Sequence, residues 1–227
     1  MTPPLVLLAG MNCTADLWAD CGFDAAVCPE LDRDSIDDQV RALLADLPET
    51  FVLVGHSLGA IVAMALTARE PERVAALCVS STNAKAPTAV QLAGWRAWLD
   101  AIGQGGTPRE LQAGILDALL SAGARGRPDI VERALAMGDD TGPGMLAQQL
   151  RLQSTRIDLR PALRGLRVPT LVIAGTDDGI CPPDFHREIA AEVPDAELIE
   201  IAGGHLLPLE SPLEFAAAVE SLRARVG

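Results

Sequence analysis

FVLVGHSLG, residues 51–59, runs directly into the apolar segment AIVAMALTA at residues 60–68. The four apolar residues 51–54 predict a short buried strand, and the segment after Gly59 predicts a buried helix. A strand that turns straight into a helix holds the residue at the turn with strained backbone angles, and glycines on either side leave room for the close approach. We therefore expect Ser57 to project above the sheet, beside the first N–H groups of the helix.

Length, charge and cysteine content exclude several classes of protein. The 227 residues suit one α/β domain with a smaller insertion. A net charge of −13 disfavours binding to nucleic acid or anionic membranes, and no apolar run approaches the ~20 residues of a membrane span. The opening residues MTPPLVLLAG lack the basic start of a signal peptide, and the five cysteines show no C-x-x-C spacing. We expect a cytoplasmic protein without nucleic-acid or membrane partners.

Apolar runs alternate with helical patterns along most of the chain. Strands are predicted at residues 5–9, 24–28, 51–54, 74–80, 170–174 and 197–201. The last helix is expected to begin with the capping box SPLE at residues 211–214 and to bury Phe215, Val219 and Leu222. This alternation predicts an α/β fold with a mostly parallel sheet of about six strands flanked by helices.

The middle of the chain has a different character. Between residues 81 and 166 no strand-like run occurs, and four helices are predicted near residues 88–102, 108–122, 128–137 and 145–155. We interpret this region as a helical cap inserted into the sheet-bearing core. The predicted division is a core of residues 1–82 and 167–227 and a cap of residues 83–166.

A serine hydroxyl needs a base within hydrogen-bond reach before it can act as a nucleophile. The chain has three histidines to supply one. His56 precedes Ser57 and is expected to pack beside the turn, while His186 is expected on the surface of a helix. His205 lies in a glycine-flanked loop after the last strand, at the carboxyl edge of the sheet where Ser57 emerges. His205 is therefore the predicted base.

The acid that orients the histidine is expected in the loop after the preceding strand. This loop, residues 175–183, contains the adjacent carboxylates Asp177 and Asp178. Either could face the imidazole, so the residues alone leave the choice open. The chain order of serine, aspartate and histidine is the one expected for a serine nucleophile on this architecture.

Four segments resemble the α/β-hydrolase superfamily, in particular its small capped serine esterases and carbon–carbon bond hydrolases. They are LVLLAGMNCTADLW (5–18), VLVGHSLGAIVA (52–63), RVPTLVIAGTDDGICPP (167–183) and GGHLLPLESPLEF (203–215). The resemblance implies the α/β-hydrolase fold without its amino-terminal hairpin. It also implies that Asp178, rather than Asp177, is the catalytic acid, and that the backbone N–H groups of Met11 and Leu58 form the oxyanion hole.

These observations favour a serine hydrolase that cleaves small-molecule carboxylic esters through an acyl-enzyme, with Ser57, His205 and Asp178 as catalytic residues. No cofactor is expected, and no residue cluster has metal-ligand spacing. Three alternatives use the same residues: carbon–carbon bond hydrolysis, acyl transfer, and ligand binding with slow turnover. The fold alone does not separate them.

The substrate pocket is the least specified part of the prediction. Asn12 lies beside the expected oxyanion hole, and Trp95 and Trp98 share one face of a cap helix. All three are candidates to line an apolar pocket, although turn and packing roles are alternatives. A lid of this kind suits a small or medium-sized substrate. Short neutral esters are expected to react faster than long-chain ones and, because the chain is acidic, faster than acyl groups on an acidic carrier protein.

Overall fold

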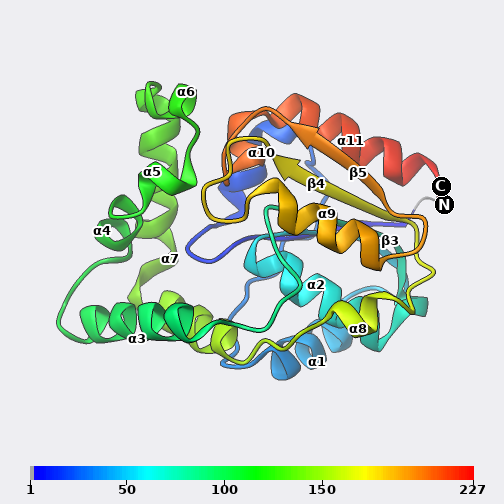
Figure 1. Ribbon diagram of the computed structural model, residues 1–227, viewed down its shortest axis with the longest axis horizontal. Helices are drawn as coiled ribbons and strands as arrows, with labels where there is room; N and C mark the ends of the chain where they lie inside the picture. The colour runs from blue at the N-terminus through cyan, green and yellow to red at the C-terminus, as the bar shows by residue number, and fades with distance from the viewer. Residues whose placement is uncertain (1–2) are drawn as a thin grey trace.

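The computed structural model describes residues 3–227, so residues 1 and 2 of the predicted core lie outside the described residues. Its centre is a five-stranded sheet in which neighbouring strands run parallel, in the order β1-β2-β3-β4-β5 (Figure 1). The strands are β1 (Leu5–Leu8), β2 (Phe51–His56), β3 (Val74–Ser80), β4 (Thr170–Gly175) and β5 (Glu197–Ile201). This architecture confirms the predicted α/β fold.

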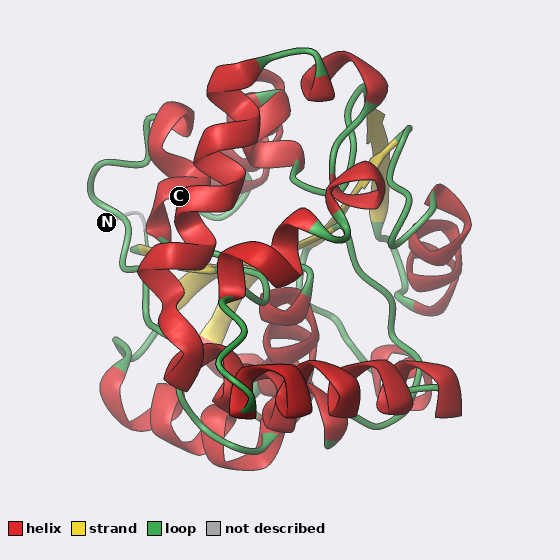
Figure 2. Cartoon of the chain, turned by 90° about the vertical axis from the view of Figure 1, so that its left-hand side faces the viewer, coloured by secondary structure: helices red, strands yellow, loops and turns green. Residues whose placement is uncertain are grey.

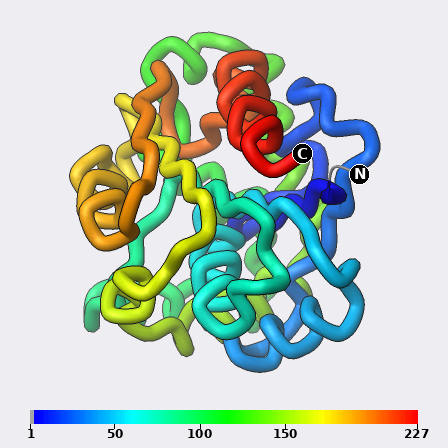
Figure 3. Tube along the Cα trace, turned by 90° about the vertical axis from the view of Figure 1, so that its right-hand side faces the viewer, coloured from blue at the N-terminus to red at the C-terminus, as the bar shows by residue number. Residues whose placement is uncertain are grey.

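Helices cover both faces of the sheet. One face carries α1 (Ile36–Asp46), α2 (Leu58–Arg69), α8 (Arg160–Leu163) and α9 (Pro183–Glu192). The other carries the 3-10 helix η1 (Ala15–Cys21), α10 (Leu207–Glu210) and α11 (Pro212–Ala224). A short 3-10 helix, η2 (Pro71–Arg73), leads into β3. The tube in Figure 3 shows the C-terminal helix above the sheet and the α1–α2 region below it.

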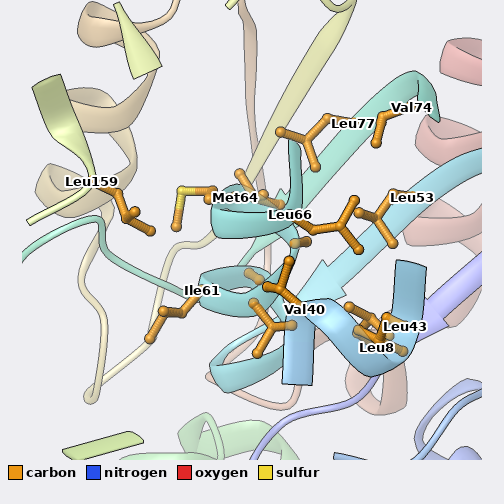
Figure 4. Packing of buried hydrophobic residues seen from close by; sticks show 14 of the residues in the cluster. Leu8, Val40, Leu43, Leu53, Ile61, Met64, Leu66, Val74, Leu77 and Leu159 are labelled. Atoms are coloured by element: carbon orange, nitrogen blue, oxygen red, sulfur yellow. The ribbon is translucent and has the colours of Figure 1, made fainter. Parts of the chain in front are cut away.

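Burial on both faces explains why β1 to β4 read as mostly apolar runs rather than alternating ones. In β2, Phe51 and Leu53 pack into the core on one face, while Val52 and Val54 pack into the core on the other. Successive strand side chains point to opposite faces, so every position of such a strand must be apolar. Figure 4 shows the first of these cores, in which side chains of α1, α2, the strands and the start of α8 meet: Leu8, Val40, Leu43, Leu53, Ile61, Met64, Leu66, Val74, Leu77 and Leu159.

The prediction of about six strands exceeds the observed sheet by one. The segment predicted as a strand at residues 24–28 makes a single bridge, through Val27, to Val6 of β1. The N–H of Leu7 donates to the Val27 carbonyl at 2.9 Å, and the N–H of Val27 donates to Leu5. The segment buries no side chain, and Pro29 has no N–H with which to extend the ladder.

Between β3 and β4 lie the helices α3 (Ala89–Gly103), α4 (Pro108–Ala113), α5 (Leu116–Leu119), α6 (Ala122–Arg125) and α7 (Pro128–Ser154). The helix predicted over residues 108–122 is divided near Gly114, and those predicted at 128–137 and 145–155 form one helix kinked at Gly142, where φ is 71°. The segment lies beyond the carboxyl ends of the strands (Figure 1), and Figure 2 shows it from that side.

The start of α11 differs from the prediction. The hydroxyl of Ser211 donates to the carbonyl of Ala202 at 2.7 Å and makes no capping hydrogen bond, because the short helix α10 ends immediately before it. The buried face of α11 is confirmed as Phe215, Val219 and Leu222. Within residues 3–227, none of the helices has the length and apolar character needed to cross a bilayer.

Candidate active site

Ser57 occupies the turn between β2 and α2 with a φ of 53° and a ψ of −114°. Few non-glycine residues adopt a positive φ, and here the geometry is imposed by close packing on both sides. A Cβ added at Gly59 would overlap the carbonyl oxygen of Leu8, and one added at Gly55 would lie 2.5 Å from the Cα of Ala60. The G-x-S-x-G spacing is therefore a steric requirement of this turn, and the turn places Ser57 at the carboxyl edge of the sheet.

The side chains of Ser57, His205 and Asp178 form a continuous chain of hydrogen bonds. His205 Nε2 lies 2.9 Å from Ser57 Oγ, and His205 Nδ1 lies 2.9 Å from Asp178 Oδ2 and 3.0 Å from Oδ1. Both His205 and Asp178 are only 4% exposed. Because a carboxylate only accepts hydrogen bonds, Nδ1 carries the proton and donates it to Asp178, which leaves Nε2 free to accept from the serine hydroxyl.

Asp178 is held in place by its own loop. Its Oδ1 accepts the backbone N–H groups of Ile180 at 2.8 Å and Cys181 at 2.7 Å. Burial by itself raises the pKa of Asp178, but the facing His205 and these N–H donors outweigh burial, so the pKa lies below its ordinary value. The carboxylate therefore stays charged. Asp177, in contrast, is exposed and accepts from its neighbour Thr176.

The two expected oxyanion donors have no competing acceptor. Within residues 3–227, neither the backbone N–H of Met11 nor that of Leu58 donates a hydrogen bond to a protein group. Leu58 is the first residue of α2, where backbone N–H groups have no partner inside the helix. Met11 lies in the loop after β1 and lines the same cavity as Ser57. Neither N–H group is thus committed to an acceptor within the protein, and Leu58 itself is fully buried.

His56 is buried beside the turn, as the sequence predicts. Its Nδ1 lies 3.1 Å from the hydroxyl of Ser80, and its ring packs edge-on against Trp18. Burial lowers its pKa well below the ordinary value for histidine, with the nearby His205 acting in the same direction. His56 is therefore a neutral packing residue behind Ser57.

The prediction for His186 is wrong, because this side chain is fully buried. Its Nε2 accepts the backbone N–H of Thr82 at 3.0 Å, and Thr82 in turn donates its hydroxyl to the carbonyl of Ser57 at 3.0 Å. Burial lowers the pKa of His186 to about 4. The i, i+3 spacing of His186 and Ile189 on α9 is the sequence signal that could have revealed its inward orientation.

A cavity of about 290 Å³ opens beside Ser57 and His205, beneath α3. Trp95 and Trp98 of α3 line it, as the sequence suggested. Asn12 does not line this cavity. Its amide donates to Gln112 at 2.7 Å and to the carbonyl of Pro108 at 3.0 Å, so it fastens the loop after β1 to α4 instead. The proposed contact of Asn12 with substrate is replaced by a structural role.

Arg156 is a cavity residue that the sequence did not single out. It follows the end of α7, is 6% exposed, and donates to Gln91 Oε1 at 3.1 Å. Its guanidinium lies 5.2 Å from the centre of the Trp95 ring. In the sequence it is one of several arginines of the middle segment, with no local pattern that distinguishes it as buried.

The other arginines of this segment do not gather into a basic patch. Seven of them form ion pairs with nearby acids: Arg109 with Glu132 and Asp139, Arg125 with Asp117, Arg127 with Asp129, Arg133 with Asp16 and Asp20, Arg151 with Asp34, Arg160 with Asp158 and Glu188, and Arg164 with Glu192. Their positive charge is locally compensated, which disfavours a docking surface for an acidic carrier.

Comparison with known proteins agrees with the fold. A pimeloyl-[acyl-carrier protein] methyl ester esterase of Aromatoleum aromaticum is 32% identical over 195 residues, which span 80% of this chain and 77% of the relative. A 3-oxoadipate enol-lactonase of Acinetobacter baylyi is 26% identical, spanning 85% and 71%. The solved structure of a thermophilic esterase from Thermogutta terrifontis, with malate bound, has the same fold, with a TM-score of 0.87 and 23% identity over 99% of this chain and 90% of that one. The model of the alpha/beta hydrolase family matches residues 7–218, and the chain belongs to this family.

Proposed function

We propose that this α/β-hydrolase cleaves small-molecule carboxylic esters through a covalent acyl-enzyme, with Ser57, His205 and Asp178 as its catalytic triad. The observation that carries the proposal is the hydrogen-bonded chain from Ser57 Oγ to the Asp178 carboxylate, with both links at 2.9 Å. Ser57 and His205, at one end of this series of hydrogen bonds, line a cavity large enough for a small substrate.

In the first half of the reaction, Ser57 Oγ attacks the ester carbonyl carbon while His205 Nε2 takes the hydroxyl proton. The imidazolium that results is stabilised by the charged Asp178. The N–H groups of Met11 and Leu58 donate hydrogen bonds to the negative charge that develops on the carbonyl oxygen, and each donor of this kind contributes roughly 3–4 kcal/mol of transition-state stabilisation. Collapse of the intermediate breaks the acyl–oxygen bond, and His205 returns its proton to the leaving alcohol.

In the second half, water replaces the alcohol. His205 takes a proton from the water as its oxygen attacks the acyl carbon, and the same N–H groups hold the oxyanion. Collapse then releases the carboxylic acid, and the proton returns from His205 to Ser57 Oγ. The protein's own side chains and backbone supply every group in this sequence, so no step requires a cofactor.

The names of the relatives support ester cleavage over carbon–carbon cleavage. One is named a methyl ester esterase and the other an enol-lactonase, and a lactone is a cyclic ester. We also propose that the enzyme works in the cytoplasm, because Cys13, Cys21, Cys28, Cys78 and Cys181 are all free thiols, as expected in a reducing compartment. Its net charge of −13 supports a small-molecule substrate rather than a nucleic acid or an anionic membrane.

The test measures hydrolysis of para-nitrophenyl acetate and labelling by a serine-directed phosphonate. The wild type should show a burst of nitrophenol followed by turnover. Ser57→Ala and His205→Ala should each lose nearly all activity, and the double variant should be little worse, because the triad acts as a unit. Ser154→Ala, which removes a hydroxyl bonded to a helix carbonyl, is the matched control and should keep full activity.

The alternatives give different results. Retention of more than a few per cent of activity in Ser57→Ala would contradict the mechanism. A burst without turnover would indicate a ligand-binding protein, and turnover that requires an added alcohol or thiol would indicate acyl transfer.

A further inference from the structure

Arg156 is a buried cation without an anionic partner. It is the one buried arginine of residues 3–227, and within this range no carboxylate oxygen lies within 4.0 Å of its nitrogens. The remaining arginines of the described chain are exposed, form ion pairs with acids or, like Arg73, donate to backbone carbonyls. A charge removed from water is unfavourable by several kcal/mol unless a partner compensates it.

The contacts of Arg156 leave most of its hydrogen-bonding capacity unused. A guanidinium carries five N–H donors, and the protein supplies one acceptor, Gln91 Oε1, together with the face of Trp95. The buried Nε has no partner. Cys181 is close enough to affect its charge, but burial raises the pKa of that thiol to about 12, so the thiol is neutral and supplies no negative charge.

Arg156 lines the same cavity as Ser57 and His205. Two residues one turn apart on α3, Gln91 and Trp95, hold the guanidinium from one side. No other lysine or arginine of the described residues lines this cavity. The chamber that contains the nucleophile therefore also contains a single fixed positive charge with free donors.

We propose that Arg156 binds a carboxylate on the substrate, so that the preferred substrates are half esters of short dicarboxylic acids. This rests on the proposed ester hydrolysis at Ser57. A carboxylate matches the planar fork of a guanidinium and supplies two acceptor oxygens. It also matches the charge, since one cation neutralises one carboxylate, whereas a phosphate would bring up to two negative charges. A cavity of about 290 Å³ limits the acid to a short chain.

The expected order of short neutral esters over acyl groups on an acidic carrier protein rests on the overall charge of −13, and this proposal adds a preference for one carboxylate on a small substrate. The net charge governs encounters at long range, and salt screens it beyond about 8 Å. Binding in the cavity depends on the local charge, which at Arg156 is positive.

The experiment compares two substrates of equal shape. One is para-nitrophenyl hydrogen adipate, and the other is the neutral ester in which an isopropyl group replaces the carboxylate. We expect kcat/KM of the wild type to favour the half ester by roughly 10- to 100-fold, the range for a hydrogen bond to a charged group. Arg156→Met should abolish this preference, mainly through KM, and Arg156→Lys should retain part of it. Arg96→Met, an exposed arginine of α3, is the matched control and should change neither value.

A second measurement does not depend on turnover. Calorimetric titration of the Ser57→Ala protein with adipate should show binding, and the double variant that also carries Arg156→Met should show none. If Arg156→Met does not fold, competitive inhibition of the wild type by adipate, and its absence with hexanoic acid amide, tests the same contact.

The outcomes separate this inference from the proposed function. Three results would each overturn the carboxylate site. The first is equal rates of the wild type on the two esters. The second is an equal loss of activity on both esters in Arg156→Met together with a lower melting temperature, and the third is binding of inorganic phosphate in preference to adipate. Failure to cleave either ester, or cleavage that survives Ser57→Ala, would refute ester hydrolysis instead, and Arg156-dependent binding of adipate would then still support the site.

Discussion

Lowering the pH is expected to destabilise the folded chain through the buried, neutral His186. Burial, only partly opposed by the negative charge of Asp178, lowers the pKa of His186 from 6.5 to about 4 in the folded protein. In the unfolded chain the imidazole titrates near its ordinary value. Between these two values the unfolded state binds a proton that the folded state does not, so stability falls as the pH drops through this window.

The size of the effect follows from the two pKa values. The interval from 6.5 to about 4, at about 1.4 kcal/mol for each pH unit, corresponds to roughly 3 kcal/mol. Above pH 6.5 the titration of His186 does not lower the free energy of unfolding, and this free energy then falls progressively as the pH is lowered toward about 4. His56, whose pKa is also lowered by burial, acts in the same direction. Against typical domain stabilities of about 5–15 kcal/mol, this is a large loss.

The assay is urea unfolding, followed by circular dichroism, at several pH values between about 7.5 and 4.5. His186→Gln is the informative variant, because its side-chain oxygen can accept the Thr82 N–H and does not titrate. At neutral pH the difference between variant and wild type gives the packing effect alone. On acidification the variant should lose up to about 3 kcal/mol less than the wild type. Parallel pH dependences for the two proteins would refute the argument that His186 is buried and neutral.

Three further predictions concern the catalytic groups. Asp178→Asn should lower kcat by up to about 10⁴-fold, the loss seen for the equivalent change in a serine protease, whereas Asp177→Asn, at an exposed position, should have little effect; equal losses would move the catalytic acid. Chelators such as EDTA should leave ester hydrolysis unchanged, and inhibition reversed by added metal would contradict the cofactor-free mechanism. Gly59→Ala should remove activity and lower the melting temperature, because its Cβ would lie 2.5 Å from the carbonyl carbon of Leu8; an active, equally stable variant would show that the turn is looser than described.

The sequence predicted most of the fold because strands and helices are indicated by patterns among neighbouring residues. The strand at residues 51–54 and the helix after Gly59 follow from apolar runs and glycine spacing, and both are present as β2 and α2. The expected strand at residues 24–28 is reduced to one bridge. Whether such a segment joins the sheet depends on the hydrogen bonds it can make to the neighbouring strand and on the helices that cover it. Its own apolar residues do not encode these partners, so the extent of an edge strand is not determined locally.

The sequence also named the residues that meet at Ser57. A histidine after the last strand and an acid after the preceding one must both lie at the carboxyl edge of a parallel sheet, so chain order alone brings His205 and the Asp177–Asp178 pair near the serine. Which carboxylate faces the imidazole was decided by the loop itself. There the N–H groups of Ile180 and Cys181 hold Asp178, and Asp177 is left exposed.

Burial of polar side chains was decided mainly by tertiary structure. Arg156 lines the cavity although no local pattern marks it as buried, and His186, whose one local signal is its i, i+3 spacing to Ile189, accepts the N–H of Thr82 just beyond β3. Asn12 turns from the expected pocket to fasten α4. Periodicity reports which face of an element is apolar, but the burial of a polar group depends on partners that are distant in the chain. The sequence by itself thus determined the α/β architecture and the nucleophile turn, whereas the packing of α3 and α7 over the sheet determined the shape and charge of the pocket.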